Sequence, residues 1–175
     1  MYKGNRQHII HGLRDGILIA MGYFAVVFSL GIIAAKAGLT PPEGFLTSFF
    51  TRASAGEYGT YTLVAVQAAY VEVVAMCLVA NLRYMLMSAA LSQKIAPGTS
   101  WFHRILMACC VTDEVFGISI AHPGYTPPAY TYSAALISTL FWASIALLAG
   151  IVAAWFRLGL FPVAAICCVI VYLLI

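Results

Sequence analysis

Long apolar stretches separated by short polar segments organise the chain. Several stretches approach the ~20 residues that a helix needs to cross a hydrocarbon core. None shows the strict alternation of an outer-membrane strand, so the pattern predicts spanning helices. The apolar segments expected to be helical are 17–35, 62–91, 104–121, 132–155 and 158–175.

The segment 45–61 departs from this pattern. Its apolar start is under two turns long, and residues 51–61 then bring charges, glycines and hydroxyls. Backbone of that kind is tolerated at membrane depth only where protein buries it or where it lines a cavity. We therefore expect a broken or re-entrant helix here, with an ordinary external loop as the alternative.

The basic residues predict a topology. Residues 1–14 are polar and basic and are expected to form a retained cytoplasmic tail. If 45–61 enters and leaves on the outer side, the basic loop 94–104 and Arg157 both fall inside. The proline-rich segment 122–130, which has no Lys or Arg, is expected outside. The chain ends on Ile175 without a polar tail, as expected if it is truncated or completed by another subunit.

The composition also indicates that the chain is embedded in a membrane. Of the 175 residues, 63% are hydrophobic and 9% charged, and the mean hydropathy is +0.95. So little polar surface cannot cover a water-soluble globule. The expected fold class is an all-α integral membrane protein, a bundle of about five full transmembrane helices plus the broken or re-entrant segment, in one transmembrane domain over residues 1–175. The net charge of +3 is small and spread over loop ends, so no nucleic-acid partner is expected.

Polar residues within the apolar stretches mark candidate sites. Arg83 lies in the middle of the stretch 62–91, and a charge at membrane depth costs at least ~2.5 kcal/mol unless it meets a partner or a wet cavity. Three clusters hold most of this polarity. They are Ser54, Gly56, Glu57 and Tyr58; Asn81 with Arg83; and Asp113 with Glu114.

These residue types suit a transporter that binds the charged groups of a small substrate. The planar fork of Arg83 can hold a carboxylate, and the amide end of a broken helix at 54–56 can assist. Glu57, Asp113 or Glu114 can meet an ammonium group or carry a coupling proton. The alternative is that Arg83 pairs permanently with Asp113 or Glu114 as a structural bridge. Glu72 is left open between a proton carrier and a partner-contact residue.

Catalytic and metal chemistry find little support. The five cysteines lie inside apolar runs without metal-ligand spacing. The four histidines fall at span ends or in loops, without a nucleophile and base in a catalytic pattern. We expect no catalytic residue, no metal, no cofactor and no enzyme.

Four motifs in order resemble the AzlC family over roughly residues 9–120. They are Gly-Leu-Arg-Asp at 12–15, Ala-Ser-Ala-Gly-Glu-Tyr at 53–58, Asn-Leu-Arg-Tyr at 81–84 and Thr-Asp-Glu-Val-Phe at 112–116. The family supplies the large permease subunit of bacterial branched-chain amino-acid exporters. Three features depart from its pattern: the prolines usual in the first span are absent, Glu57 stands where a glutamine is usual, and the C-terminal part is short for the family.

The resemblance implies a multi-pass permease of the bacterial plasma (inner) membrane that exports branched-chain or similar amino acids by a secondary mechanism. It also implies a small hydrophobic AzlD-type membrane subunit as partner, and it places all eight candidate residues on family motif positions. The extra carboxylate at Glu57 favours a more cationic substrate or a different coupling ion. Two other readings stay open, a passive small-molecule channel and a non-transporting membrane scaffold subunit.

Overall fold

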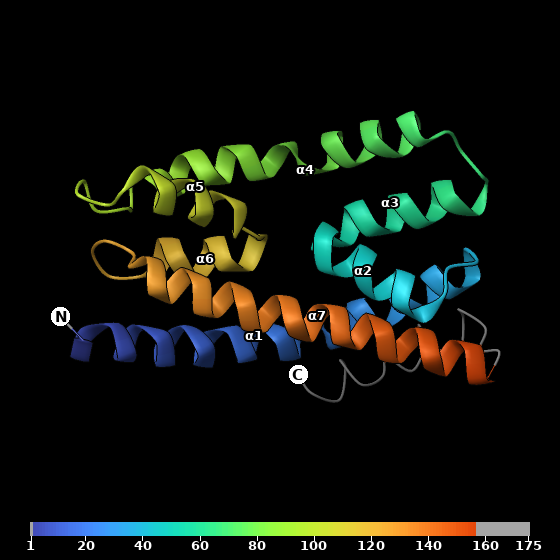
Figure 1. Ribbon diagram of the computed structural model, residues 1–175, viewed down its shortest axis with the longest axis horizontal. Helices are drawn as coiled ribbons and strands as arrows, with labels where there is room; N and C mark the ends of the chain where they lie inside the picture. The colour runs from blue at the N-terminus through green and yellow to red at the C-terminus, as the bar shows by residue number, and fades with distance from the viewer. Residues whose placement is uncertain (1, 157–175) are drawn as a thin grey trace. The chain divides into compact units, whose positions relative to one another are not determined.

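The computed structural model describes residues 2–156, and each regular element among them is an α-helix (Figure 1). The expected all-α class is confirmed for these residues. Arg157 and the segment 158–175 lie outside the described residues. The helices are α1 (Tyr2–Lys36), α2 (Pro41–Thr51), α3 (Ser54–Ala65), α4 (Tyr70–Ser92), α5 (Trp101–Cys109), α6 (Asp113–Ala121) and α7 (Pro128–Phe156).

Within residues 2–156, three helices are long and apolar enough to cross a membrane, namely α1, α4 and α7. The expected count of about five full spans is not confirmed. Helix α1 begins at Tyr2, so the residues expected to form a tail are helical. Two prolines stand in the first turn of α2, where a missing backbone N–H costs little.

The chain divides into two compact units. Unit 1 comprises Met1–Met21 and Asn81–Thr139, and unit 2 comprises Gly22–Ala80 and Leu140–Ile175. Helices α1, α4 and α7 each contribute one part to unit 1 and the other part to unit 2. Each unit also contains one pair of short helices, α5 and α6 in unit 1 and α2 and α3 in unit 2.

In unit 2, α2 and α3 form a helical hairpin (Figure 1). Ser48 Oγ of α2 donates a hydrogen bond of 2.9 Å to Glu57 Oε2 of α3. Arg52, between the two helices, adopts a left-handed φ of 47°. At ~1.5 Å per residue neither helix exceeds ~18 Å, which is short of a ~30 Å hydrocarbon core. The predicted break within 45–61 is confirmed, and the segment forms a hairpin rather than a loop.

The expected single span over 104–121 is wrong. Helices α5 and α6 have nine residues each and are interrupted at residues 110–112. The expected placement of 122–130 opposite the loop 94–104 is also wrong. Lys94 Nζ donates to the carbonyl oxygens of His122 at 2.8 Å and Gly124 at 3.2 Å, so both loops lie at one end of unit 1. The chain therefore enters α5 and leaves α6 at the same end.

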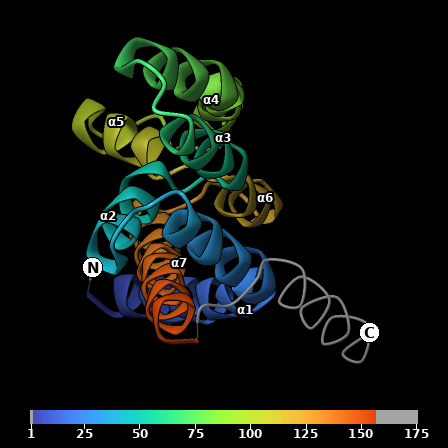
Figure 2. The ribbon, with the colours of Figure 1, turned by 90° about the vertical axis from the view of Figure 1, so that its right-hand side faces the viewer.

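The expected continuous helix over 62–91 is wrong as well. Residues 66–69 separate α3 from α4, and Gln67 among them has a φ of +54°. Glu72 accepts the Ala69 N–H at 3.1 Å, so its carboxylate caps the first turn of α4. In unit 2, Thr60 Oγ1 lies 3.2 Å from Cys77 Sγ, which places α3 beside α4 (Figure 2).

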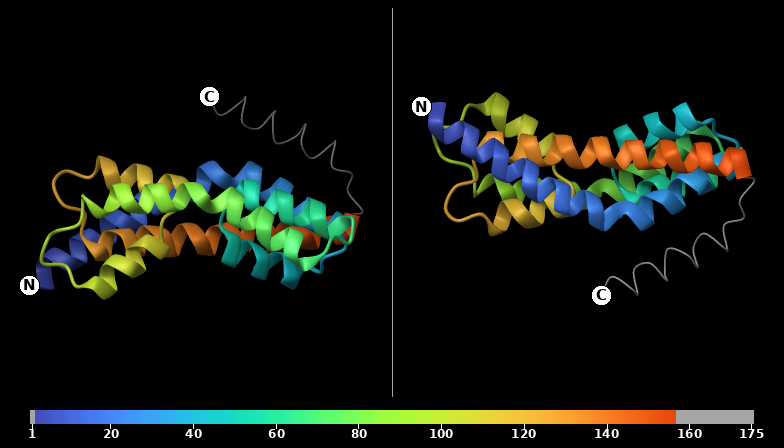
Figure 3. Two further views of the ribbon diagram at one scale, coloured as in Figure 1. Left: turned by 90° about the horizontal axis from the view of Figure 1, so that it is seen from above. Right: turned by 90° about the horizontal axis from the view of Figure 1, so that it is seen from below.

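Glycines bring α1 and α7 close together in both units (Figure 3). A Cβ added at Gly16 would lie 2.8 Å from the Ala134 carbonyl oxygen in unit 1, and one at Gly31 would lie 2.6 Å from that of Ala146 in unit 2. The missing side chains at these two glycines let the backbones of α1 and α7 approach each other closely. Gly22 differs, because a Cβ there would meet nothing within 4 Å.

Glu43 stabilises the first turn of α2, and this gives a testable pH dependence. Its Oε2 accepts the Thr40 backbone N–H and the Thr40 hydroxyl, each at 2.7 Å, and these bonds lower the pKa of Glu43. A carboxyl whose pKa is lower in the folded state stabilises the fold at neutral pH and ceases to do so as the pH falls through that pKa. We expect amide-exchange protection of Thr40 to fall on acidification in the wild type. In Glu43→Gln it should be weak at every pH.

Hydrogen exchange followed by mass spectrometry on the segment 37–44 measures this effect, after correction for the intrinsic pH dependence of exchange. Amides in the middle of α7 serve as the internal control. An unchanged pH response in Glu43→Gln would contradict the capping role.

Candidate functional site

Arg83 of α4 and Asp113 of α6 form an ion pair in unit 1. Arg83 Nη2 lies 2.9 Å from Asp113 Oδ2, and the two side chains are 42% and 35% exposed. The guanidinium also lies 5.1 Å from the centre of the Tyr84 ring. The structure thus brings together two predicted residues from separate sequence clusters. Because both are partly exposed, each keeps surface on which a ligand can bind.

The start of α6 gathers negative charge. Thr112 caps this helix, its Oγ1 accepting the Val115 N–H at 3.4 Å. Asp113 and the half-buried Glu114 then occupy the first turn, where the helix dipole favours carboxylates. The interruption at 110–112 therefore places two carboxylates at the start of α6, between the two short helices.

Asn81 and Arg83 leave α4 on opposite faces, because two residues turn a helix by about 200°. The Asn81 Oδ1 atom is buried without a hydrogen-bond partner. The side-chain hydroxyls of Ser119 and Thr131, also in unit 1, are likewise buried without a hydrogen-bond partner. An unpaired buried acceptor costs about 1–3 kcal/mol, so such atoms suit a water molecule or a ligand donor. The Asn-Leu-Arg motif thus contributes to two faces of α4.

Glu57 forms the second polar cluster, in unit 2. Its side chain is 0% exposed. Ser48 Oγ donates to Oε2 at 2.9 Å and Tyr61 OH to the same atom at 3.3 Å. The Trp142 indole N–H of α7 donates to Oε1. A predicted site residue is therefore enclosed by groups from three helices.

The other three predicted residues of 54–58 occupy different environments. Ser54 is the half-buried first residue of α3, whose N-terminal amides begin there. Gly56 is buried, and its carbonyl oxygen accepts the Thr60 hydroxyl at 2.8 Å. Tyr58 is exposed. Of these four residues, Glu57 alone has its side chain bonded into the cluster with Trp142.

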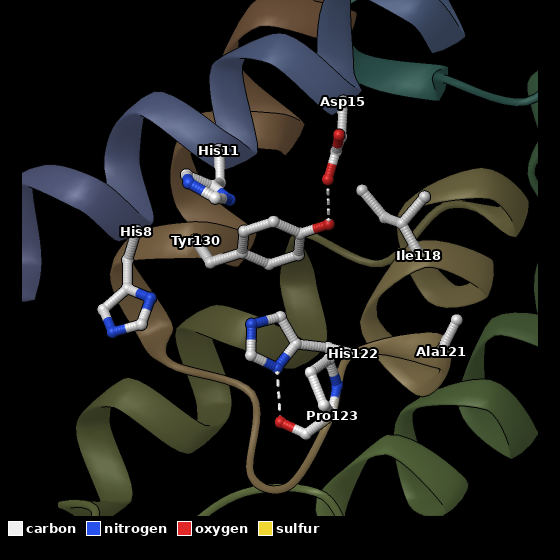
Figure 4. A pocket seen from close by; sticks show the side chains of 8 residues that line it. All are labelled: His8, His11, Asp15, Ile118, Ala121, His122, Pro123 and Tyr130. Atoms are coloured by element: carbon white, nitrogen blue, oxygen red, sulfur yellow. Dashed lines mark hydrogen bonds between the residues drawn. The ribbon is translucent and has the colours of Figure 1, made fainter.

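Sequence reasoning missed a pocket in unit 1 (Figure 4). The pocket has a volume of about 450 Å³. Tyr130 lies within it and donates from its hydroxyl to Asp15 Oδ2 at 2.6 Å. The remaining lining residues are His8, His11, Ile118, Ala121, His122 and Pro123.

A sequence signal for this pocket existed. His8, His11 and Asp15 are spaced three and four residues apart, which is one face of a helix. The expectation of a tail over residues 1–14 hides this spacing, because it assigns no helix to His8 and His11, whereas α1 begins at Tyr2. Among residues 2–156, no group of three or more His, Cys, Asp or Glu side chains is placed to hold a metal ion.

The fold and the site together define a helical membrane protein whose short paired helices carry charged residues. The chain matches the AzlC protein family over residues 18–156 and belongs to that family. It is also similar to an uncharacterised membrane protein of Archaeoglobus fulgidus, with 29% identity over 112 residues, which are 62% of this chain and 47% of that protein. The chain thus spans about half the length of the relative. No solved structure matches the chain.

Proposed function

We propose that this chain is the large subunit of a secondary transporter that exports branched-chain or related small amino acids across the bacterial plasma membrane. Its partner in this proposal is a small hydrophobic AzlD-type subunit. Membership of the AzlC family supports the proposal. The observation that carries it is the partly exposed Arg83–Asp113 pair at the start of α6.

An ion pair of this kind can accept a zwitterion by exchange of partners. The substrate carboxylate takes the place of Asp113 on the guanidinium of Arg83, whose fork favours two parallel hydrogen bonds. The released Asp113 carboxylate then binds the substrate ammonium group. Charge stays balanced throughout, which matters in a region of low dielectric.

The surroundings of the pair suit an apolar substrate side chain. Leu82 and Leu86, close to Arg83 on α4, are 54% and 76% exposed. Aliphatic side chains there can contact the branched side chain of valine, leucine or isoleucine, at about 25 cal/mol per Å² of apolar area buried. A zwitterion with a short aliphatic side chain therefore satisfies both the charged pair and its flanks.

Efflux from proteoliposomes tests the proposal. Vesicles containing this chain, with and without the small partner, are preloaded with labelled valine, leucine or isoleucine, and labelled lysine serves as the cationic comparison. We expect saturable efflux of the branched-chain substrates that responds to a proton gradient and requires both subunits.

The other outcomes separate the alternatives. Efflux that does not saturate and does not change with the proton gradient would favour the passive channel. No efflux of any of the four substrates from verified, partner-complete vesicles would reject the amino-acid exporter and favour the scaffold subunit. Efflux of lysine in place of the branched-chain substrates would correct the substrate class.

A further inference from the structure

The Glu57 carboxyl is built into a closed hydrogen-bond network between a helical hairpin and a long helix. Ser48 comes from α2, Tyr61 from α3 and Trp142 from α7, and the exposed fractions of these three side chains are 0%, 0% and 6%. Tyr23 of α1 packs edge-on against the Trp142 ring, with centroids 4.7 Å apart. The three hydrogen bonds that Glu57 receives all come from neutral groups.

The network can satisfy both protonation states of Glu57. The indole N–H of Trp142 is a donor in either state. The hydroxyls of Ser48 and Tyr61 lie 3.3 Å apart, and either can donate to the other. When Oε2 is ionised both hydroxyls can point to it, and when it carries a proton one hydroxyl can turn to accept that proton. Adding or removing a proton therefore leaves no buried group unpaired.

We propose that Glu57 is the proton-binding group that couples transport to the proton gradient. This inference rests on the proposed transport function and assigns its coupling ion. In each cycle the carboxylate takes up one proton and later releases it, with no other bond formed or broken. Of the groups bonded to Glu57, only Tyr61 titrates, and a phenol ordinarily does so near pH ~10. Arg52, between α2 and α3, is the charged residue nearest in sequence.

Protonation acts on the contact between the α2–α3 hairpin and α7. The Trp142 N–H bond to an ionised carboxylate is charge-assisted and roughly twice as strong as a bond to a neutral carboxyl. The ionised state thus holds the hairpin against α7, and protonation loosens it. Since the carboxyl is fully enclosed, exchange of its proton with water requires that same separation, which links the proton to a conformational change.

The first experiment compares efflux of labelled valine with and without a proton gradient, using partner-complete proteoliposomes. We expect the ratio of the two rates to exceed one in the wild type and to fall to one in Glu57→Gln, whose side-chain oxygen still accepts the Trp142 N–H. Glu43→Gln is the matched control and should keep the wild-type ratio, because Glu43 caps the exposed start of α2. A wild-type ratio in Glu57→Gln would overturn the inference and leave the exporter intact.

A spectroscopic readout tests the proton without any flux. Infrared difference spectra of the same vesicles, recorded across pH, should contain a protonated-carboxyl carbonyl band that is missing in Glu57→Gln. In Trp142→Phe, which removes the indole N–H, the band should shift in frequency. Spectra without such a band at any pH would reject proton binding at Glu57. Failure of the wild type to move any amino acid, with the band present, would reject the transport function and the coupling role that rests on it.

Discussion

Arg83→Ala is expected to abolish saturable efflux of valine while the protein remains folded. The substitution removes the guanidinium that holds the substrate carboxylate and leaves Asp113 without the partner it has at 2.9 Å. Truncating one member of a hydrogen-bonded charge pair at a binding site costs about 2 kcal/mol or more, which is ~30-fold or more in affinity. Initial rates of efflux over a range of valine concentrations, in partner-complete proteoliposomes, measure the loss.

Two further variants separate substrate binding from a structural bridge. Arg14→Ala removes an exposed arginine of the same unit and should leave the efflux rate near that of the wild type. The exchange Arg83→Asp with Asp113→Arg restores an ion pair in reversed orientation. A purely structural bridge would recover efflux in this double variant. A substrate site would recover stability without efflux, because the charged groups would then face the wrong ends of the zwitterion.

The helical class and the break near Arg52 could be predicted from sequence because both depend on local composition. Helix is the regular structure that satisfies backbone groups within one segment, so apolar stretches of sufficient length predict it directly. The break was visible because small, charged and hydroxylated residues interrupt an apolar run. Neither prediction required knowledge of residues far away in the chain.

The breaks at 66–69 and 110–112 could not be read in the same way. The second contains Cys110, Val111 and Thr112, with no glycine or proline to mark an interruption. Its signal was the sequence Thr-Asp-Glu, a plausible helix start that the apolar pattern on both sides outweighed. The apolar pattern therefore predicts loops on opposite sides of the α5–α6 pair, whereas the Lys94 contacts place both loops at one end of unit 1.

The candidate site also contains one contact that the sequence could predict and one that it could not. Arg83 and Asp113 could be proposed as partners because an unpaired charge within an apolar stretch is energetically costly. The hydrogen bond from Trp142 to Glu57 could not be predicted. The two residues are 85 positions apart, and the sequence of α7 has the pattern of an ordinary apolar span. Hydropathy identifies polar residues that need partners, but only the fold supplies a long-range donor.

Gly31→Leu is expected to destabilise the protein more strongly than the same substitution at Gly22, which is also on α1. A Cβ at Gly31 would lie 2.6 Å from the Ala146 carbonyl oxygen and 2.6 Å from Ala149 Cβ. Backbone atoms of α7 cannot turn aside as a flexible side chain can, so the two helices must separate and lose their contact in unit 2. Overpacking of this kind costs about 1–3 kcal/mol, and more where the surroundings cannot relax.

Gly22→Leu is the matched control, because it makes the same change on the same helix where a Cβ meets nothing within 4 Å. Both variants gain the same helix propensity from Gly→Leu. The difference between their unfolding midpoints therefore reports the steric cost alone. Unfolding in mixed detergent micelles, followed by circular dichroism, gives the midpoint of each variant. The structure requires a large downward shift for Gly31→Leu and little for Gly22→Leu. Equal shifts would mean that α1 and α7 do not approach each other closely at Gly31.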